Sequence, residues 1–242
     1  MWSWVRPRTP EDKALDRFRA VSACGGRGHP RFHGMRFALT LDHLAVTCRT
    51  IEEGVSYVEA VLGVEMSPGG QHPVMGTHNA LVSLGPDAYL EVIAIDPDQA
   101  APLHRRWFDL DRYAGPPRMT HWICATDDLE DALADAPEGS GNPIELSRGD
   151  LSWRMAVPAT GILPFDAAMP ALIEWDTDLH PNTRLPDHGL RLARLDVFHP
   201  EADRLLDAFP ALYNLDRVTL REGPEKRLIA SISTPEGIRV LA

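Results

Sequence analysis

The chain has 242 residues, a hydrophobic content of 44% and a formal net charge of −11 at pH 7. Its basic residues are scattered, which argues against a nucleic acid or an anionic membrane surface as partner. The sequence contains no apolar run near the roughly 18 residues of a membrane span, and its start lacks a signal-peptide core. Three separated cysteines, Cys24, Cys48 and Cys124, are typical of reduced thiols. We therefore expect a cytoplasmic globular protein.

Residues 1–36 differ in composition from the rest of the chain. Thr9-Pro10 starts a predicted helix that continues through Ala14 to Val21, and a loop rich in Gly, Pro, Arg and His follows from Cys24 to Gly34. We expect this segment to be an N-terminal extension.

The first predicted unit covers residues 37–98. Alternating apolar residues from Arg36 to Cys48 predict a strand. Regular alternation places three side chains on one face: Leu41, His43 and Ala45. Thr50 is then a predicted helix N-cap, and the helix ends at Gly63.

Three further strands complete this unit in the order βαβββ. They are predicted at Val64–Met66, Asn79–Leu84 and Ala88–Ile95, with a turn at Ser67–Gly70 after the first of them. Glu91 lies on the last strand among apolar neighbours. A carboxylate buried in such a strand needs a partner or a metal.

The same pattern returns in residues 118–181, after a connector at residues 99–117 that is predicted to contain a short helix. Aligned without gaps, His43 falls on His121, and a glutamate, Glu174, again lies on the last apolar strand. The predicted elements of this second unit are a strand at Met119–Ala125, a helix at Asp128–Ala136, and strands at Ile144–Arg148, Leu151–Val157 and Ala171–Trp175. The loop Pro158–Pro170 interrupts them, and a loop of that length commonly covers a site.

Residues 182–242 are predicted to form a degenerate third unit of the βαββ type. Its strands are expected at Leu190–Val197, Arg217–Leu220, Arg227–Ser233 and Ile238–Leu241, with a helix at Glu201–Phe209. The aligned positions carry neither the histidine nor the glutamate. We expect this extension to pack on the two units, and a homodimer contact is a further possibility.

These residues carry a resemblance to the vicinal oxygen chelate superfamily, and within it to the glyoxalase-like domain family. The motifs are Leu41-Asp42-His43-Leu44, Gly76-Thr77-His78-Asn79, Leu84 to Glu91, and Ile173-Glu174-Trp175-Asp176. The resemblance implies an α+β fold in which tandem βαβββ modules form a half-open barrel. It also implies a divalent metal (Zn, Ni, Fe, Mn or Co) at the following positions: His43, Glu91, His121 and Glu174.

Imidazole and carboxylate ligands suit such a metal, which acts as a Lewis acid on vicinal oxygens of a small-molecule substrate. By analogy Glu174 would also move the proton, as an isomerase or lyase requires. The predicted substrate-binding residues are His78, Asn79, Trp122 and Trp153. Two alternatives remain open: a metal-free binding protein of the bleomycin-resistance kind, and an extradiol-type Fe(II) dioxygenase.

Overall fold

The structure of the chain is a computed structural model that describes residues 36–177 and 179–242. The described residues belong to one compact unit. The helix and loop predicted within residues 1–35 lie outside the described residues. In the described part of the chain, no helix is long and apolar enough to cross a bilayer.

The first module has the predicted βαβββ order. Its elements are β1 (Leu39–Thr47), α2 (Ile51–Leu62), β2 (Ser67–His72), β3 (Thr77–Ser83) and β4 (Tyr89–Ile95). The Thr50 side chain accepts a hydrogen bond from the Glu53 N–H and so caps α2. Gly63 ends the helix in the left-handed conformation that a residue without a Cβ adopts readily.

The second module repeats this order after a 3₁₀ helix in the connector, η1 (Trp107–Arg112). Its elements are β5 (Arg118–Thr126), α3 (Leu129–Asp135), β6 (Asn142–Arg148), β7 (Leu151–Val157), α4 (Pro164–Ala167) and β8 (Ala171–Trp175). Asp128 caps α3 by accepting from the Asp131 N–H. The single turn α4 lies within the loop that the sequence predicts before β8.

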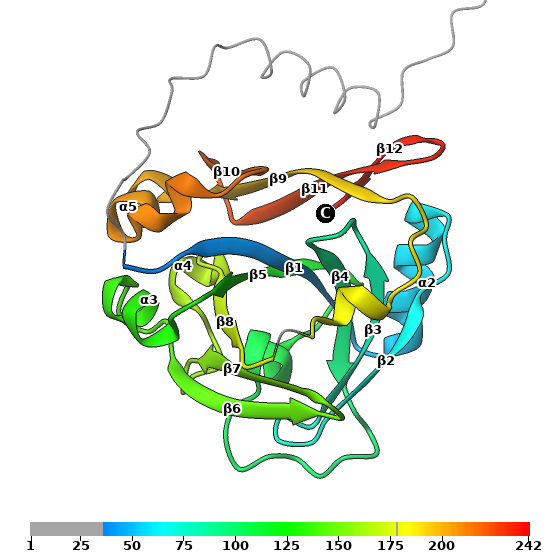
Figure 1. Cartoon of the computed structure of the whole chain (residues 1–242), viewed down its shortest axis with the longest axis horizontal. Helices are drawn as coiled ribbons and strands as arrows, with labels where there is room; N and C mark the ends of the chain where they lie inside the picture. Colours follow the sequence, from blue (N-terminus) through cyan, green and yellow to red (C-terminus); the bar gives the residue numbers. More distant parts are fainter. Residues whose placement is uncertain (1–35, 178) are drawn as a thin grey trace, which may run out of the picture. The chain divides into compact units, whose positions relative to one another are not determined.

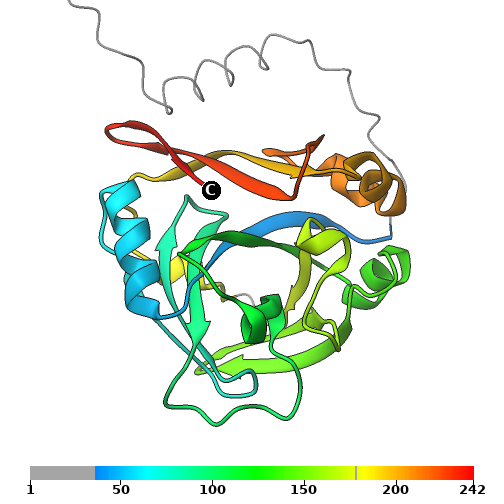
Figure 2. The ribbon, with the colours of Figure 1, turned by 180° about the vertical axis from the view of Figure 1, so that it is seen from behind.

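The two modules share one curled eight-stranded sheet with the order β2-β3-β4-β1-β5-β8-β7-β6 (Figure 1). The central strands β1 and β5 are antiparallel, whereas β1–β4 and β5–β8 are parallel pairs. Ala45, Ile93, Ile123 and Ile173 belong to the core inside the curl. This is the half-open barrel that the sequence predicts, and η1 lies inside its ring of strands (Figure 2).

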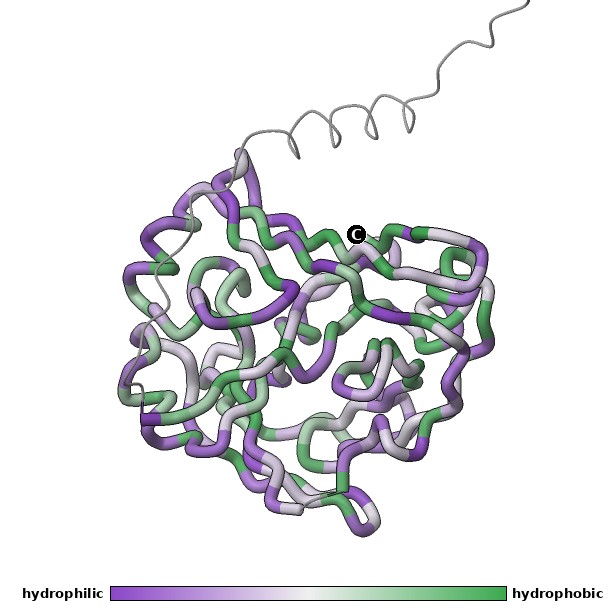
Figure 3. Tube along the Cα trace, turned by 45° about the horizontal axis from the view of Figure 1, so that its top comes forward, coloured by the Kyte–Doolittle hydropathy of each residue, from purple (hydrophilic) through white to green (hydrophobic). Residues whose placement is uncertain are grey.

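A second sheet covers the outer face of the first. It contains β9 (Arg191–His199), β10 (Val218–Glu222), β11 (Arg227–Thr234) and β12 (Gly237–Leu241) in the order β10-β9-β11-β12. The linking helices are η2 (Pro181–Arg184), α5 (Ala202–Ala208) and η3 (Pro210–Asn214). Leu44 and Val46 of β1 share one buried apolar core with Val197 of β9 and Ile232 of β11. Apolar segments run through the interior, whereas the periphery is mostly hydrophilic (Figure 3).

Two local predictions are wrong. The strand expected at Val64–Met66 is found at Ser67–His72, where a turn was predicted; a proline is tolerated there because β2 is an edge strand. In β1, the pairing with β5 shifts register between Leu41 and His43. The shift breaks the regular alternation of the strand. Leu41 therefore joins the apolar core between the two sheets, here called the outer core, while His43 lines the cavity inside the curl.

Candidate functional site

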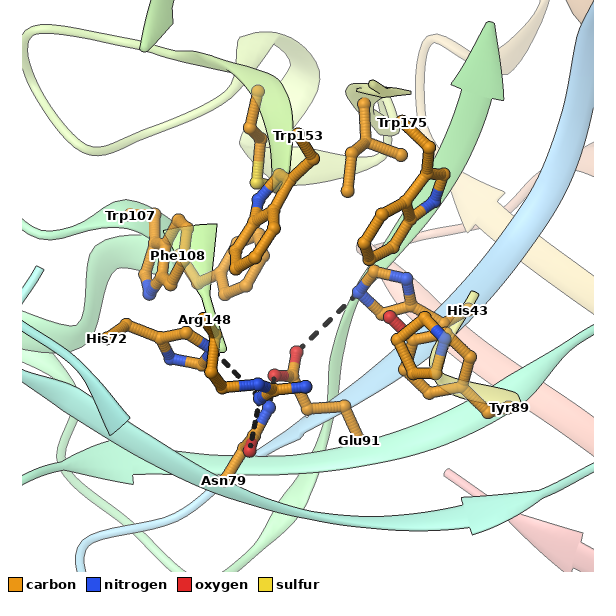
Figure 4. Close-up of a pocket in the computed structure, with 13 residues that line it drawn as sticks. His43, His72, Asn79, Tyr89, Glu91, Trp107, Phe108, Arg148, Trp153 and Trp175 are labelled. Atoms are coloured by element: carbon orange, nitrogen blue, oxygen red, sulfur yellow. Dashed lines mark hydrogen bonds and ion pairs between the residues drawn. The ribbon is translucent and has the colours of Figure 1, made fainter. Parts of the chain in front are cut away.

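A polar cavity of about 30 Å³ lies inside the half-barrel. Its polar lining comes from β1, β2, β3, β4 and β6, and its aromatic lining from η1, β7 and β8 (Figure 4). The main residues are His43, His72, Asn79, Tyr89, Glu91, Trp107, Phe108, Arg148, Trp153 and Trp175. Such a volume holds little more than one or two water molecules, because the side chains themselves fill the space.

His43 is held in the cavity by a buried carboxylate. Its Nδ1 lies 2.5 Å from Asp42 Oδ1, and its ring stacks on Tyr89 with centroids 4.4 Å apart. The other Asp42 oxygen accepts from Trp175 Nε1 at 2.8 Å and lies 3.0 Å from His180 Nε2. Asp42 is the extra residue at the register shift, and this places its carboxylate beside the ring that follows it.

Glu91 faces the same imidazole from β4. Its Oε2 lies 3.6 Å from His43 Nε2, and its Oε1 accepts from Asn79 Nδ2 at 2.6 Å. The Asn79 oxygen in turn accepts from the Gly70 N–H at 2.8 Å and from Arg148 at 3.2 Å. Arg148 comes from the edge strand β6 and therefore reaches across the opening between the two sheet edges to β3.

The charges of these groups follow from their neighbours. Burial alone would lower the pKa of His43, but the hydrogen bond to Asp42 and the Glu91 carboxylate outweigh it and raise that pKa to about 9. Burial would raise the pKa of Glu91, yet the neighbouring His43 holds it below its usual value. Hydrogen bonds from His180 and His43 likewise overcome burial and hold the pKa of Asp42 far below its usual range. The cavity thus contains an imidazolium between two carboxylates.

Glu174 does not reach this cavity. Its side chain points to the other face of β8, where Oε2 accepts from the Leu129 N–H at 2.7 Å and from Arg154 at 2.7 Å. It therefore binds the first turn of α3. The register of the strand pairs explains why Glu174 lies outside the cavity. On β1 and β4, Ala45 pairs with Glu91; on β5 and β8, Ile123, which aligns with Ala45, pairs with Ala171. The position equivalent to Glu91 is Ala171, which has no ligating group.

His121 faces the inside of the curl but lies apart from His43 in a different hollow. The ring of Phe108 stands against it, with centroids 4.7 Å apart. Among the predicted substrate-binding residues, Asn79 and Trp153 line the cavity. The other two do not line it: Trp122 is in the outer core and donates to the Ala168 carbonyl, and His78 lies on the opposite face of β3 from Asn79.

The four-ligand metal site implied by the sequence is not assembled. Within residues 36–177 and 179–242, no group of three or more His, Cys, Asp and Glu side chains is placed to hold an ion. Only His43 and Glu91 meet, and the Arg148 guanidinium lines the same cavity. A fixed positive charge there opposes a divalent cation, so these residues do not fit the implied metal.

The sequence predictions missed several residues that build the site. Asp42 and Tyr89 were not selected, although both stand directly in the strand motifs. The sequence allows His72 and Arg148 as binders of an anionic substrate but favours surface positions for them. They reach the cavity because the two edge strands β2 and β6 approach each other. His72 Nδ1 lies 3.1 Å from the Thr77 hydroxyl, and its Nε2 lies 3.5 Å from Arg148.

Paired βαβββ modules around a shared polar cavity define a vicinal oxygen chelate fold. The chain belongs to the glyoxalase-like domain family, which it matches over residues 41–213. That match extends past the two modules into the C-terminal segment. No curated protein matches the chain significantly.

Three solved structures are similar to this chain at low sequence identity. A hypothetical protein from Staphylococcus aureus is 13% identical with a TM-score of 0.56, covering 82% of this chain and 92% of its own. A methylmalonyl-CoA epimerase from Streptomyces coelicolor, in complex with 2-nitronate-propionyl-CoA, is 20% identical with a TM-score of 0.40, covering 59% of this chain and 100% of its own. The epimerase from Mycobacterium tuberculosis is 15% identical with a TM-score of 0.37, covering 56% and 85%.

Proposed function

We propose that the protein is a glyoxalase-like isomerase or lyase that moves a proton on a small 2-oxo or 2-hydroxy acid. One observation carries the proposal: His43 and Glu91, an acid and a base of opposite charge, face each other 3.6 Å apart in a buried cavity. Such a pair is suited to general acid–base chemistry at a carbon next to a carbonyl or carboxyl group.

Arg148 would receive the carboxylate of this substrate. A guanidinium binds carboxylates through two parallel hydrogen bonds. Because the cavity holds only about 30 Å³, the substrate must occupy space that the Arg148 side chain now fills. The aromatic walls, Trp107, Trp153 and Trp175, exclude water around the reacting carbon.

The proton transfer follows from the arrangement. Glu91 removes a proton from the carbon next to a C=O group, the C–H electrons form a C=C bond, and the C=O π electrons move to the oxygen. His43 donates its Nε2 proton to that oxygen to give an enol. Substrate between the two groups separates Glu91 from the imidazolium, so burial then increases the basicity of the carboxylate. Asp42 keeps the His43 ring oriented, and holds it protonated before this step. Return of a proton to carbon gives the isomer or the exchanged substrate.

The other readings of the sequence have less support. A Lewis-acid metalloenzyme with four protein ligands needs Glu174 and His121 beside His43, and they lie elsewhere. An Fe(II) dioxygenase needs two histidines and one carboxylate on one ion, but here His43 and His121 line different hollows. A sequestering protein is favoured by the aromatic walls, but the small cavity argues against a large ligand.

Hydrogen–deuterium exchange tests the proposal. The purified protein is incubated in D₂O with pyruvate, 2-oxobutyrate, lactate or glycerate. Loss of the C3–H signal of the 2-oxo acids, or of the C2–H signal of the 2-hydroxy acids, is followed by ¹H NMR. We expect exchange with at least one acid, reduced at least 10²-fold by Glu91→Gln. The substitution keeps the side-chain size, and the glutamine oxygen can still accept the hydrogen bond from Asn79.

Glu174→Gln is the matched control, since it alters a glutamate of the same sequence motif outside the cavity. We expect it to exchange at the wild-type rate. Bound metal is measured in the same three samples. Loss of exchange together with loss of stoichiometric metal in Glu174→Gln would refute the mechanism in favour of the metalloenzyme, and exchange that survives Glu91→Gln would refute it outright.

A further inference from the structure

A second hollow, of about 300 Å³, shares the Phe108 ring with the first cavity. Four parts of the chain build it: the connector around η1, strand β5, the loop around α4, and the segment before β11. Their main contributions are Phe108, Arg118, His121, Asp166 and Lys226. Its volume is within the range of sites that accept small metabolites, unlike that of the first cavity.

His121 forms the buried part of this hollow and has an unused hydrogen-bonding atom. Its side chain is 4% exposed, and Nδ1 lies 2.8 Å from the Thr120 hydroxyl, which itself contacts the Thr47 hydroxyl. Nε2 is buried without a hydrogen-bond partner in the described structure. When the Thr120 hydroxyl donates to Nδ1, Nε2 carries the proton and can donate it to a ligand. A buried group of this kind is costly unless something binds it.

Two cations of the same hollow lack an acidic partner. Among the described residues, neither Lys226 nor Arg118 forms an ion pair with a carboxylate. Lys226 Nζ donates to the Thr120 carbonyl at 2.5 Å, and Arg118 lies over the ring of Tyr113 at 4.8 Å. Burial lowers the pKa of Lys226 to about 8, with Arg118 acting in the same direction. The ammonium group is therefore in a position that a bound anion would stabilise.

Of the remaining charged groups on the lining, Asp166 offsets part of the effect of burial by raising the pKa of Lys226, but burial outweighs it. Arg112 pairs with Asp109 at 2.8 Å. Asp166 is 86% exposed and its carboxylate lies 3.8 Å from His199 Nε2. The arrangement therefore runs from exposed Arg118 at the rim, past partly buried Lys226, to His121 on the floor.

The backbone around this hollow is strained. Four non-glycine residues on its lining have φ between 51° and 63°: Phe108, Asp109, Asp166 and Ala167. Left-handed conformations of such residues persist where the surrounding structure holds them, and they concentrate at functional sites.

We propose that this hollow binds a small metabolite through a carboxylate or phosphate group, which Lys226 and Arg118 hold while His121 Nε2 donates to one of its oxygens. The site is separate from the proposed catalytic pair and does not depend on it. Its cation Lys226 comes from the segment between β10 and β11, so the site requires the C-terminal extension as well as the two modules.

The lysine content of the chain makes a direct test possible, because Lys226 and Lys13 are the only lysines in the sequence. Trinitrobenzenesulfonate labels both amines in the full-length protein, and mass spectrometry measures each separately. We expect inorganic phosphate or acetate to slow labelling of Lys226 at least tenfold in a saturable manner, relative to Lys13 and to sodium chloride of equal ionic strength. Protection by phosphate, by acetate or by both identifies the anionic group that the site accepts.

The variant Arg118→Met tests the geometry without altering the labelled residue. We expect it to weaken protection at least tenfold, whereas Arg49→Met, which removes an exposed arginine paired with Glu53, should leave protection unchanged. Circular dichroism checks that both variants are folded. The proposal would be overturned if neither phosphate nor acetate protected Lys226 at 50 mM. Equal protection in wild type and Arg118→Met would overturn it as well.

Discussion

The two modules place a histidine at the same point of their first strand, yet the two imidazoles differ in every contact. His43 binds Asp42, faces Glu91 and has a pKa raised to about 9 against the opposing effect of burial. His121 has a hydrogen bond to the Thr120 hydroxyl and no carboxylate beside it in the described structure, and burial lowers its pKa well below the usual value. The repeated backbone therefore determines where each imidazole lies, whereas the neighbouring side chains determine its charge.

Two positions account for this difference. Asp42, which precedes His43, is replaced by Thr120 before His121. The place of Glu91 on β4 is taken by Ala171 on β8. An imidazole between two carboxylates is stabilised as a cation, but one buried without them stays neutral. The first module thus retains an acid–base pair, and the second provides a neutral hydrogen-bonding group.

Exchanging each histidine for glutamine gives the largest expected contrast. We expect His43→Gln to reduce the deuterium exchange rate at least 10²-fold, because the proton donor is lost. His121→Gln should change that rate by less than threefold, since its ring faces the other hollow. The rate constants are measured by ¹H NMR with the same substrate for both variants.

Protection of Lys226 by phosphate or acetate should distinguish the same two variants in the opposite way. His121→Gln should weaken protection of Lys226, whereas His43→Gln should not. Equal loss of exchange in the two histidine variants would mean that both act at one centre, as the shared metal site would require.

Replacing the neighbour of His43 is the second strongest perturbation. We expect Asp42→Asn to slow exchange about 10²-fold, because an amide neither stabilises the imidazolium nor fixes its orientation as the carboxylate does. It should also lower the pKa of His43 from about 9, which histidine ring NMR signals recorded from pH 5 to 10 would show. An unchanged titration of His43 would indicate that Asp42 does not hold its charge. The signals of His121 are the internal reference.

Much of the fold could be predicted because its signals are local. The N-caps Thr50 and Asp128, the helix end at Gly63 and the repeated strand–helix order all appear in short stretches of sequence. Strands β7 and β8 have the predicted bounds. A local pattern of burial and capping is enough to define such elements.

The site was only partly predictable, because it depends on register and on sheet closure. The shift at Asp42 turns a residue expected to face away into the partner of His43. On β8, Glu174 and the cavity-facing Ile173 differ by one residue, and a one-residue step reverses the face of a strand. Arg148 reaches the cavity only because two edge strands that are far apart in sequence approach each other.

His72 gives a smaller, pH-dependent effect on stability. Burial lowers its pKa to about 4, although Glu91 acts in the opposite direction. Between pH 6.5 and 4 the unfolded chain binds a proton at this residue and the folded chain does not, so stability falls as the pH falls through this window. A buried histidine with this pKa shift lowers the unfolding free energy by about 3 kcal/mol across the window.

Urea unfolding at pH 7.5 and pH 5 measures this contribution. The wild type should lose more stability between the two pH values than His72→Gln, which cannot bind the proton. The same loss in both proteins would show that other groups cause the acid sensitivity.

Glu174→Gln gives the smallest expected effect. It tests the register of β8, which decides whether Glu174 lies outside the cavity. Glu174 accepts from the Leu129 N–H in the first turn of α3 and pairs with Arg154. Loss of this charge should cost about 1 kcal/mol of unfolding free energy, the usual effect of removing an anion from a helix N-terminus. Reduced stability with normal exchange is the outcome for a glutamate outside the cavity. Normal stability with lost exchange would mean that β8 is shifted by one residue in solution, and the two modules would then both contribute a carboxylate to one centre.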